Sequence, residues 1–200
     1  MNRRSAPSAG ATTRDLFPSL DRIRSDTIRC QVEAVWNEAI DTGNAGRGWT
    51  TDELRELPFT LLADATPMRF IEHLNSCSEQ CLAIADVLQR IFGERVPIDT
   101  DTLLAGALLA DVGKLFEFER CPDRGLIQGE SGRLLRHPFT GAALCRKHRL
   151  PDAITHIVAT HSHEGDRIQR SIECIIFHHA DFIDFDIAKA LAMAARGPNS

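Results

Sequence analysis

The stretch LLADVGK at residues 108–114 ends an apolar helical run with an aspartate, a glycine and a lysine. The run begins near residue 100, where "DTDT" supplies Thr or Asp as a helix cap. Its buried side consists of Leu103, Leu104, Ala107 and Leu108. Asp111 falls on the same side. A carboxylate among apolar side chains is unstable unless another charge compensates it, so the stretch predicts a cation beside Asp111.

Two helices are predicted before this run. Residues 68–92 carry apolar side chains at alternating spacings of four and three, which indicates an amphipathic helix, and Gly93 is placed to end it. A first helix over about 19–40 shows a similar stripe, and the glycine-rich "DTGNAGRG" at 41–48 breaks it.

The second half of the chain predicts more helices. Residues 121–136 are predicted to be a loop that contains Gly and Arg. Pro138 suits the first turn of a helix to about Leu150, Pro151 begins another through Thr160, and the last helix covers about 168–194. No stretch alternates convincingly as a strand would. We therefore predict an all-α bundle.

Composition sets limits on partners and location. Hydrophobic residues make up 43 %, charged residues 26 %, and the net charge is −5, which favours neither nucleic acid nor an anionic membrane surface. No apolar run approaches the ~20 residues that span a bilayer, and "MNRRSAPSAGATTRD" lacks the apolar segment of a secretory signal. The six cysteines include no CxxC pair, so we expect free thiols and a cytoplasmic protein.

Several ionisable residues face inward from different helices. Each alone has an ordinary explanation, such as a core histidine bonded to a carbonyl or an aspartate in an ion pair. Together they indicate a divalent cation, because His and Asp on facing helices of a bundle form a metal site. The predicted ligands are His73, Asp111, His137, His161 and Asp181.

The order and surroundings of these ligands resemble the HD superfamily, the all-α metal-dependent phosphohydrolases. The similar segments are "RFIEHLNSC", "LLADVGK", "RHPFTGAAL", "IVATHSHEG" and "IIFHHADFID", spread over about residues 65–190. The resemblance implies an HD-domain helical bundle with an N-terminal helical extension. The expected division is a flexible tail at 1–15, the extension at 16–66 and the HD-type metal-binding domain at 67–195.

Position 110 departs from the family pattern. Where the His-Asp doublet has histidine, this chain has Ala110, which offers no electron pair. The five remaining ligands suit one divalent transition metal well and a second weakly, and do not distinguish Fe, Mn, Zn and Ni. An experimenter would install alanine here to disable the site. The intact surroundings favour such an engineered change, although one sequence does not separate it from a native alanine.

The resemblance implies hydrolysis of a phosphate ester of a small molecule or nucleotide by metal-activated water. Asp111, Lys114 and His163 are the predicted catalytic residues, and the anionic substrate is expected to meet four residues: Lys114, Arg133, Arg136 and His178.

Two other functions stay open on the sequence. A minority branch of the superfamily uses a di-iron pair to oxidise small organic substrates, and the positions of His137 and His161 fit that branch as well. The third possible function is a catalytically dead domain that only binds a ligand. The retention of five costly polar groups argues against it. The first helix is amphipathic and either covers the pocket or packs on a second subunit, so a homodimer is also predicted.

Overall fold

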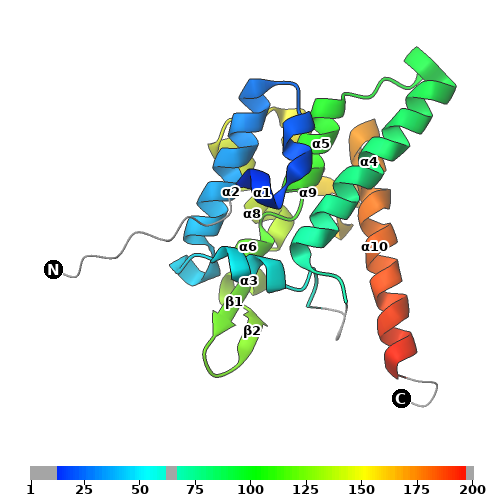
Figure 1. Cartoon of the computed structure of the whole chain (residues 1–200). Coiled ribbons are helices and arrows are strands. Elements are labelled where there is room, and N and C mark those ends of the chain that lie inside the picture. The colour runs from blue at the N-terminus through cyan, green and yellow to red at the C-terminus, as the bar shows by residue number, and fades with distance from the viewer. Residues whose placement is uncertain (1–12, 62–66, 197–200) are drawn as a thin grey trace.

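The computed structural model describes residues 13–61 and 67–196 of the chain. Its helices pack around one central helix, with a small hairpin at one edge (Figure 1). The helices are α1 (Thr13–Leu16), α2 (Asp26–Gly46), α3 (Thr51–Glu56), α4 (Phe70–Phe92), α5 (Thr100–Leu109), α6 (Lys114–Glu117), α7 (Glu130–Leu134), α8 (His137–Lys147), α9 (Asp152–Thr160) and α10 (Ile172–Arg196). Short 3-10 turns lie at Pro18–Arg22, Gly93–Arg95 and His163–Gly165. The all-α prediction is confirmed.

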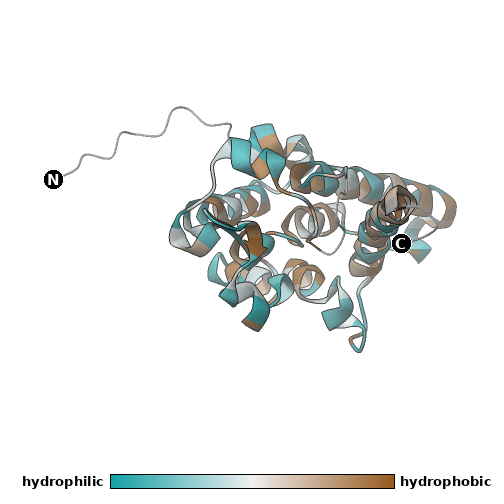
Figure 2. Ribbon diagram, turned by 90° about the horizontal axis from the view of Figure 1, so that it is seen from below, coloured by the Kyte–Doolittle hydropathy of each residue, from teal (hydrophilic) through white to brown (hydrophobic). Residues whose placement is uncertain are grey.

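The central helix is α5, which is buried along its whole side-chain surface from Asp101 to Leu109. It packs against α2, α4, α9 and α10, and a helix that is apolar all round belongs in the interior. The surrounding helices are amphipathic, as the alternation of brown and teal residues in Figure 2 shows. Because Asp111 directly follows this helix, its carboxylate lies in the middle of the molecule.

The N-terminal extension is part of the core. Val32, Val35 and Trp36 of α2 are completely buried, and Trp36 Nε1 donates a hydrogen bond to the Leu108 carbonyl at 3.1 Å. The same hydrophobic cluster continues into α4, α5, α8 and α9, so the core crosses the predicted boundary between residues 66 and 67. No residue of α2 lines the cavity beside Asp111.

The prediction of one helix over 19–40 was wrong at its start. The chain forms the turn at Pro18–Arg22 and begins α2 only at Asp26, after Ser25 caps it by accepting from the Ile28 N–H. Asp101 holds this junction, because its two carboxylate oxygens accept from the N–H groups of Arg24 and Ser25 at 3.0 and 2.9 Å. The predicted break at 41–48 agrees with the non-helical backbone of residues 43–45.

The flexible tail predicted at 1–15 falls mostly outside the described residues, which begin at Thr13. Residues 13–15 of that range belong to α1, and Thr13 Oγ1 donates a hydrogen bond to Asn37 Oδ1 at 2.8 Å.

The predicted loop at 121–136 was also wrong. Strands β1 (Phe118–Cys121) and β2 (Gly125–Gln128) pair antiparallel, with Phe118 opposite Gln128, and α7 follows them. Gly125 takes a φ of +70°, which glycine adopts without strain, at the end of the turn. Strands of four residues are too short to be recognised from alternation of apolar and polar residues. Among the described residues, no helix is both long and apolar enough to cross a bilayer.

Candidate metal centre

The segment after α5 turns sharply and places Asp111 against α8. A Cβ at Gly113 would lie 2.1 Å from the carbonyl oxygen of His137, so only glycine lets the two backbones approach this closely. α6 then begins at Lys114, one turn beyond Asp111. The sequence "DVGK" therefore brings a carboxylate, an ammonium and the start of α8 to one point.

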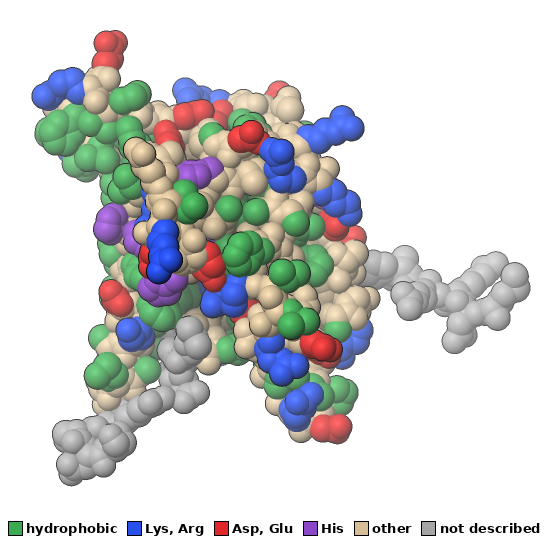
Figure 3. Space-filling model, turned by 180° about the vertical axis from the view of Figure 1, so that it is seen from behind, with side chains coloured by type: hydrophobic (Ala, Val, Ile, Leu, Met, Phe, Trp, Pro, Cys, Tyr) green, Lys and Arg blue, Asp and Glu red, His purple; other side chains and the backbone are tan. Residues whose placement is uncertain are grey.

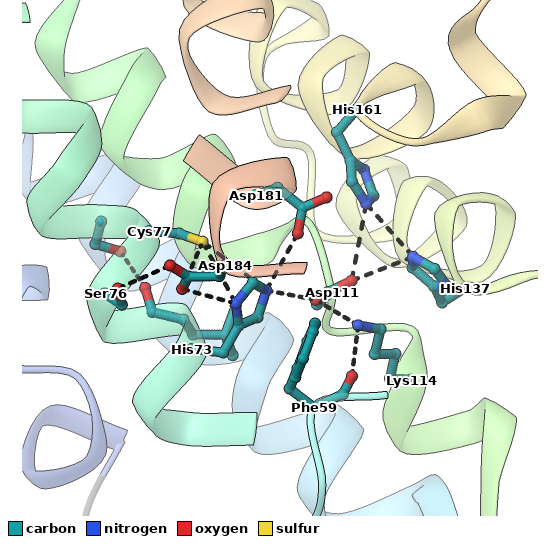
Figure 4. A network of polar contacts seen from close by, with 12 residues as sticks. Phe59, His73, Ser76, Cys77, Asp111, Lys114, His137, His161, Asp181 and Asp184 are labelled. Carbon is teal, nitrogen blue, oxygen red and sulfur yellow. Dashed lines mark hydrogen bonds and ion pairs between the residues drawn. The ribbon is translucent and has the colours of Figure 1, made fainter. Parts of the chain in front are cut away.

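Asp111 is the hub of the polar network in Figure 4. Its Oδ1 lies 3.2 Å from His137 Nε2 and 3.7 Å from His161 Nε2. Its Oδ2 lies 3.4 Å from His73 Nε2 and 2.7 Å from Lys114 Nζ. The residue is only 1 % exposed. Four elements thus direct nitrogen atoms at one buried carboxylate.

His73 on α4 connects Asp111 to α10. Its Nε2 lies 3.2 Å from Asp181 Oδ1, and its Nδ1 lies 3.1 Å from Asp184 Oδ2. Asp184 was missed by the sequence analysis, although its spacing of three from Asp181 puts both on one helix face. A carboxylate on the far nitrogen fixes the orientation of the imidazole and leaves the other nitrogen directed inward.

His137 and His161 form the other side of the centre. Their Nε2 atoms are 3.4 Å apart, while His137 Nδ1 lies 3.0 Å from Glu117 Oε2 and His161 Nδ1 lies 2.9 Å from the Val158 carbonyl. Glu117 was also missed. The available signal was an acid between two phenylalanines in "LFEF", since an acid in that context is costly unless it is paired.

These donors form two sets that share Asp111. One set is His73, Asp111 and Asp181, and the other is Asp111, His137 and His161; within each, the donor atoms lie within 4.8 Å of one another. Each imidazole already has its far nitrogen bonded to a carboxylate or carbonyl. Buried nitrogen and oxygen donors of this kind fit a divalent transition metal. The structure brings all five predicted ligands together, and their role as ligands stays a prediction.

The charges of the centre reinforce one another. Burial opposes ionisation of Asp111, but the Lys114 ammonium and the facing imidazoles outweigh it and hold the pKa of the carboxyl well below its usual range. Burial likewise opposes protonation of His73, yet the carboxylates around it raise its pKa well above the usual value.

Ala110 leaves one donor set short. Its side chain is completely buried in an apolar cluster that includes Cys77, Ile157, Phe177 and Ala180. Cys77 of this cluster contacts the His73 ring at 3.6 Å from Nδ1, on the side of Asp184 rather than of Asp111, and Ala180 precedes Asp181 in the chain. That a histidine at position 110 would join the donors around His73 stays a prediction.

A cavity of about 330 Å³ opens beside the centre. Lys114 lines it and donates to the Phe59 carbonyl as well as to Asp111. Arg136 lines it too, with Nε 3.3 Å from Glu117 and Nη1 3.6 Å from Glu164. Figure 3 shows histidine side chains close to basic and acidic ones on the face seen from behind the view of Figure 1.

The other predicted site residues lie differently. His163 lines the cavity at its exposed rim, where its Nδ1 lies 3.1 Å from Asp166. Arg133 does not line this cavity: it lies on α7 in a separate surface depression with the hairpin residues Arg124 and Ile127, so the structure gives no support to its predicted contact with substrate. His178 does not line the cavity either, since its Nδ1 is bound to the His161 carbonyl at 2.6 Å.

Comparison with known families agrees with this geometry. The family model described as "HD domain" matches residues 70–186, which is more than half of the chain. The chain belongs to the HD domain family. The matched region of this HD domain runs from the first residue of α4 to within α10, and so contains all five predicted ligands.

A curated relative is similar to this HD domain over part of its length. It is the dihydroneopterin 2′,3′-cyclic phosphate phosphodiesterase of Methanocaldococcus jannaschii, 36 % identical over 120 residues. The alignment covers 58 % of this chain and 46 % of the relative, so the chain matches about half of that protein. The search of solved structures gave no significant match.

Proposed function

We propose that this HD domain is a metal-dependent phosphodiesterase that cleaves a small-molecule phosphate ester, with a cyclic phosphodiester as the first candidate. The observation that carries the proposal is the pair of donor sets that share Asp111 at the floor of a cavity lined by Lys114 and Arg136. The printed activity of the archaeal relative supports the choice of a cyclic phosphodiester.

The protein's own residues would divide the work as follows. His73, Asp111, Asp181, His137 and His161 would hold one or two divalent ions. A bound metal supplies Lewis acidity, which lowers the pKa of water and polarises a phosphoryl oxygen. Lys114 Nζ and the Arg136 guanidinium hold the phosphate through charge-assisted hydrogen bonds. His163, at the rim, is placed to exchange a proton with the departing alcohol oxygen.

The balance of charge favours a diester over a monoester. Lys114 is already paired with Asp111, and Arg136 with Glu117, so neither cation is free of a carboxylate. Asp181 adds a further negative charge to the lining. A phosphodiester carries one negative charge and a monoester up to two near neutral pH, so these two side chains, considered apart from the charge of a bound metal, suit the diester better.

The test is hydrolysis of a phosphate-ester panel by protein loaded separately with Fe, Mn, Zn or Ni. Cyclic phosphodiesters should be cleaved, EDTA should abolish cleavage, and Asp111→Asn should remove both bound metal and activity. Arg133→Ala is the matched control, because Arg133 lies outside the cavity, and it should retain wild-type rates. About two equivalents of iron together with an oxygen-dependent product would instead establish the oxygenase reading, and ligand binding without turnover would establish a dead domain.

The cytoplasmic location and the homodimer remain predictions of the sequence. Sedimentation of the purified chain at several concentrations measures the second of these directly.

A further inference from the structure

Four phenylalanine residues line the cavity beside the metal centre, and three of them, Phe59, Phe182 and Phe185, form a continuous aromatic wall. The Phe59 ring lies 4.5 Å from the His73 ring, so this aromatic wall begins at the centre itself. Phe185 follows at 6.2 Å from Phe59, and Phe182 at 6.1 Å from Phe185. Phe182 is the neighbour of Asp181 in sequence, so the wall and a predicted ligand share one turn of α10.

The two phenylalanines of α10 do not serve the core. Neither belongs to the two hydrophobic clusters, and both remain partly exposed although α10 buries other residues completely, Phe177 among them. Their spacing of three puts both on the helix face that meets the cavity. Large aromatic rings kept partly exposed in a concave site are a binding surface for a ligand.

Neighbouring groups fix the ring of Phe182 before any ligand arrives. His178 packs on it at 4.5 Å, and His163 meets it edge to face at 5.5 Å. His178 is itself held by the His161 carbonyl. A ring that is already oriented loses little conformational freedom on binding, which strengthens association. His178, predicted from the sequence to touch substrate, is in this arrangement a positioning residue for Phe182.

We propose that Phe182 and Phe185 form a stacking subsite for a planar heteroaromatic ring, with the phosphate of the same molecule held by Lys114 and Arg136. The inference rests on the proposed phosphodiesterase function. An aromatic lining favours a flat ring over an alkyl chain, because π-faces stack. The cavity volume of about 330 Å³ is near the small end for ligand sites, which favours a compact ring over a long chain.

The subsite is tested with two cyclic phosphates, adenosine 2′,3′-cyclic phosphate and glycerol 1,2-cyclic phosphate, which share the reacting group and differ in the ring. Phe182→Leu in the metal-loaded chain should raise KM for the adenosine compound about tenfold, within the range for one stacked base, with kcat changed less than KM. The glycerol compound should be unaffected, and Phe182→Trp should restore the adenosine KM. Phe139→Leu is the control, since Phe139 is 55 % exposed on α8 and does not line the cavity.

Equal effects on both compounds, or none on either, would overturn the subsite. If neither compound is hydrolysed, the proposed function fails for cyclic phosphates, and equilibrium dialysis then tests the subsite by itself. Tighter binding of the adenosine compound than of the glycerol compound, weakened about tenfold by Phe182→Leu, supports the subsite without turnover. Equal binding of the two compounds excludes it.

Discussion

Restoring a histidine at position 110 is the sharpest test of the metal centre. Ala110 directly precedes Asp111 at the end of the buried helix α5. An imidazole there would add a fourth protein donor to the set formed by His73, Asp111 and Asp181. We expect Ala110→His to bind more metal than the chain with alanine at this position and to hydrolyse phosphodiesters faster.

Two opposing magnitudes follow from the structure. Ala110 is 0 % exposed among apolar neighbours, so without metal the larger side chain should lower the free energy of unfolding by ~1–3 kcal/mol through overpacking. Removing the residue that hydrogen-bonds to a metal ligand weakens metal affinity ~10–100-fold. Adding a new ligand should therefore strengthen metal affinity by at least the same factor. Under saturating metal this gain adds ~1.4–2.7 kcal/mol to the unfolding free energy.

The assay is urea unfolding followed by circular dichroism, with EDTA or with excess Mn²⁺, together with metal analysis after desalting. The signature is a larger metal-dependent increase in unfolding free energy for Ala110→His than for the starting chain. Ala110→Leu controls for side-chain volume, because leucine fills a similar space without an electron pair. This variant should show the decrease in unfolding free energy without the metal-dependent increase. An unchanged metal content and an unchanged metal-dependent increase would refute the reasoning that position 110 adjoins the donor set.

Four further outcomes are expected. Asp184→Asn should leave His73 less firmly oriented and weaken metal binding ~10–100-fold in a titration; wild-type affinity would contradict this role. Gly113→Ala should force His137 away from Asp111 and lower the unfolding free energy by ~1–3 kcal/mol, seen in the same urea assay. Burial lowers the pKa of His137, but Asp111 and Glu117 raise it by more, so its folded-state pKa exceeds 6.5. The stabilisation that results is complete below pH 6.5 and is lost as the pH rises through the folded-state pKa. The urea midpoint of EDTA-treated protein should therefore fall over that interval, and His137→Gln should flatten the profile. Asp101→Ala should cost ~1–3 kcal/mol by leaving the N–H groups of Arg24 and Ser25 unpaired, with Asp21→Ala as a surface control near wild-type stability.

The sequence predicted the helices that have long apolar stripes or clear end signals. α4 matches its predicted span to within two residues because its stripe is regular and Gly93 ends it. The junction at residues 23–25 could not be predicted, because the carboxylate that holds it, Asp101, is 76 residues away from Ser25 in the chain. The hairpin was missed because its strands are too short to show alternation.

The candidate site was predictable where residue type and helix face coincide. His73 and Asp181 lie on inward faces of long helices, so periodicity placed them. The supporting carboxylates Asp184 and Glu117 were harder to predict. Each orients a histidine on a different helix, and no fixed sequence spacing relates two residues on separate helices. Arg133 and His178 do not line the cavity although each lies close to a predicted ligand in the sequence, because proximity along the chain does not fix the direction of a side chain.

The two halves of the centre are anchored to parts of the fold that differ in how easily they open. Asp111 follows α5, the helix enclosed on every side, whereas His137 follows α7 and a segment whose Leu134 is 77 % exposed. Exposed, weakly packed segments open locally at far lower free energy than the interior. If His137 binds an ion as predicted, we therefore expect the ion to exchange with solvent through a brief opening of that segment, and hydrogen exchange to register the opening at residues 129–137 while the rest of the bundle stays protected.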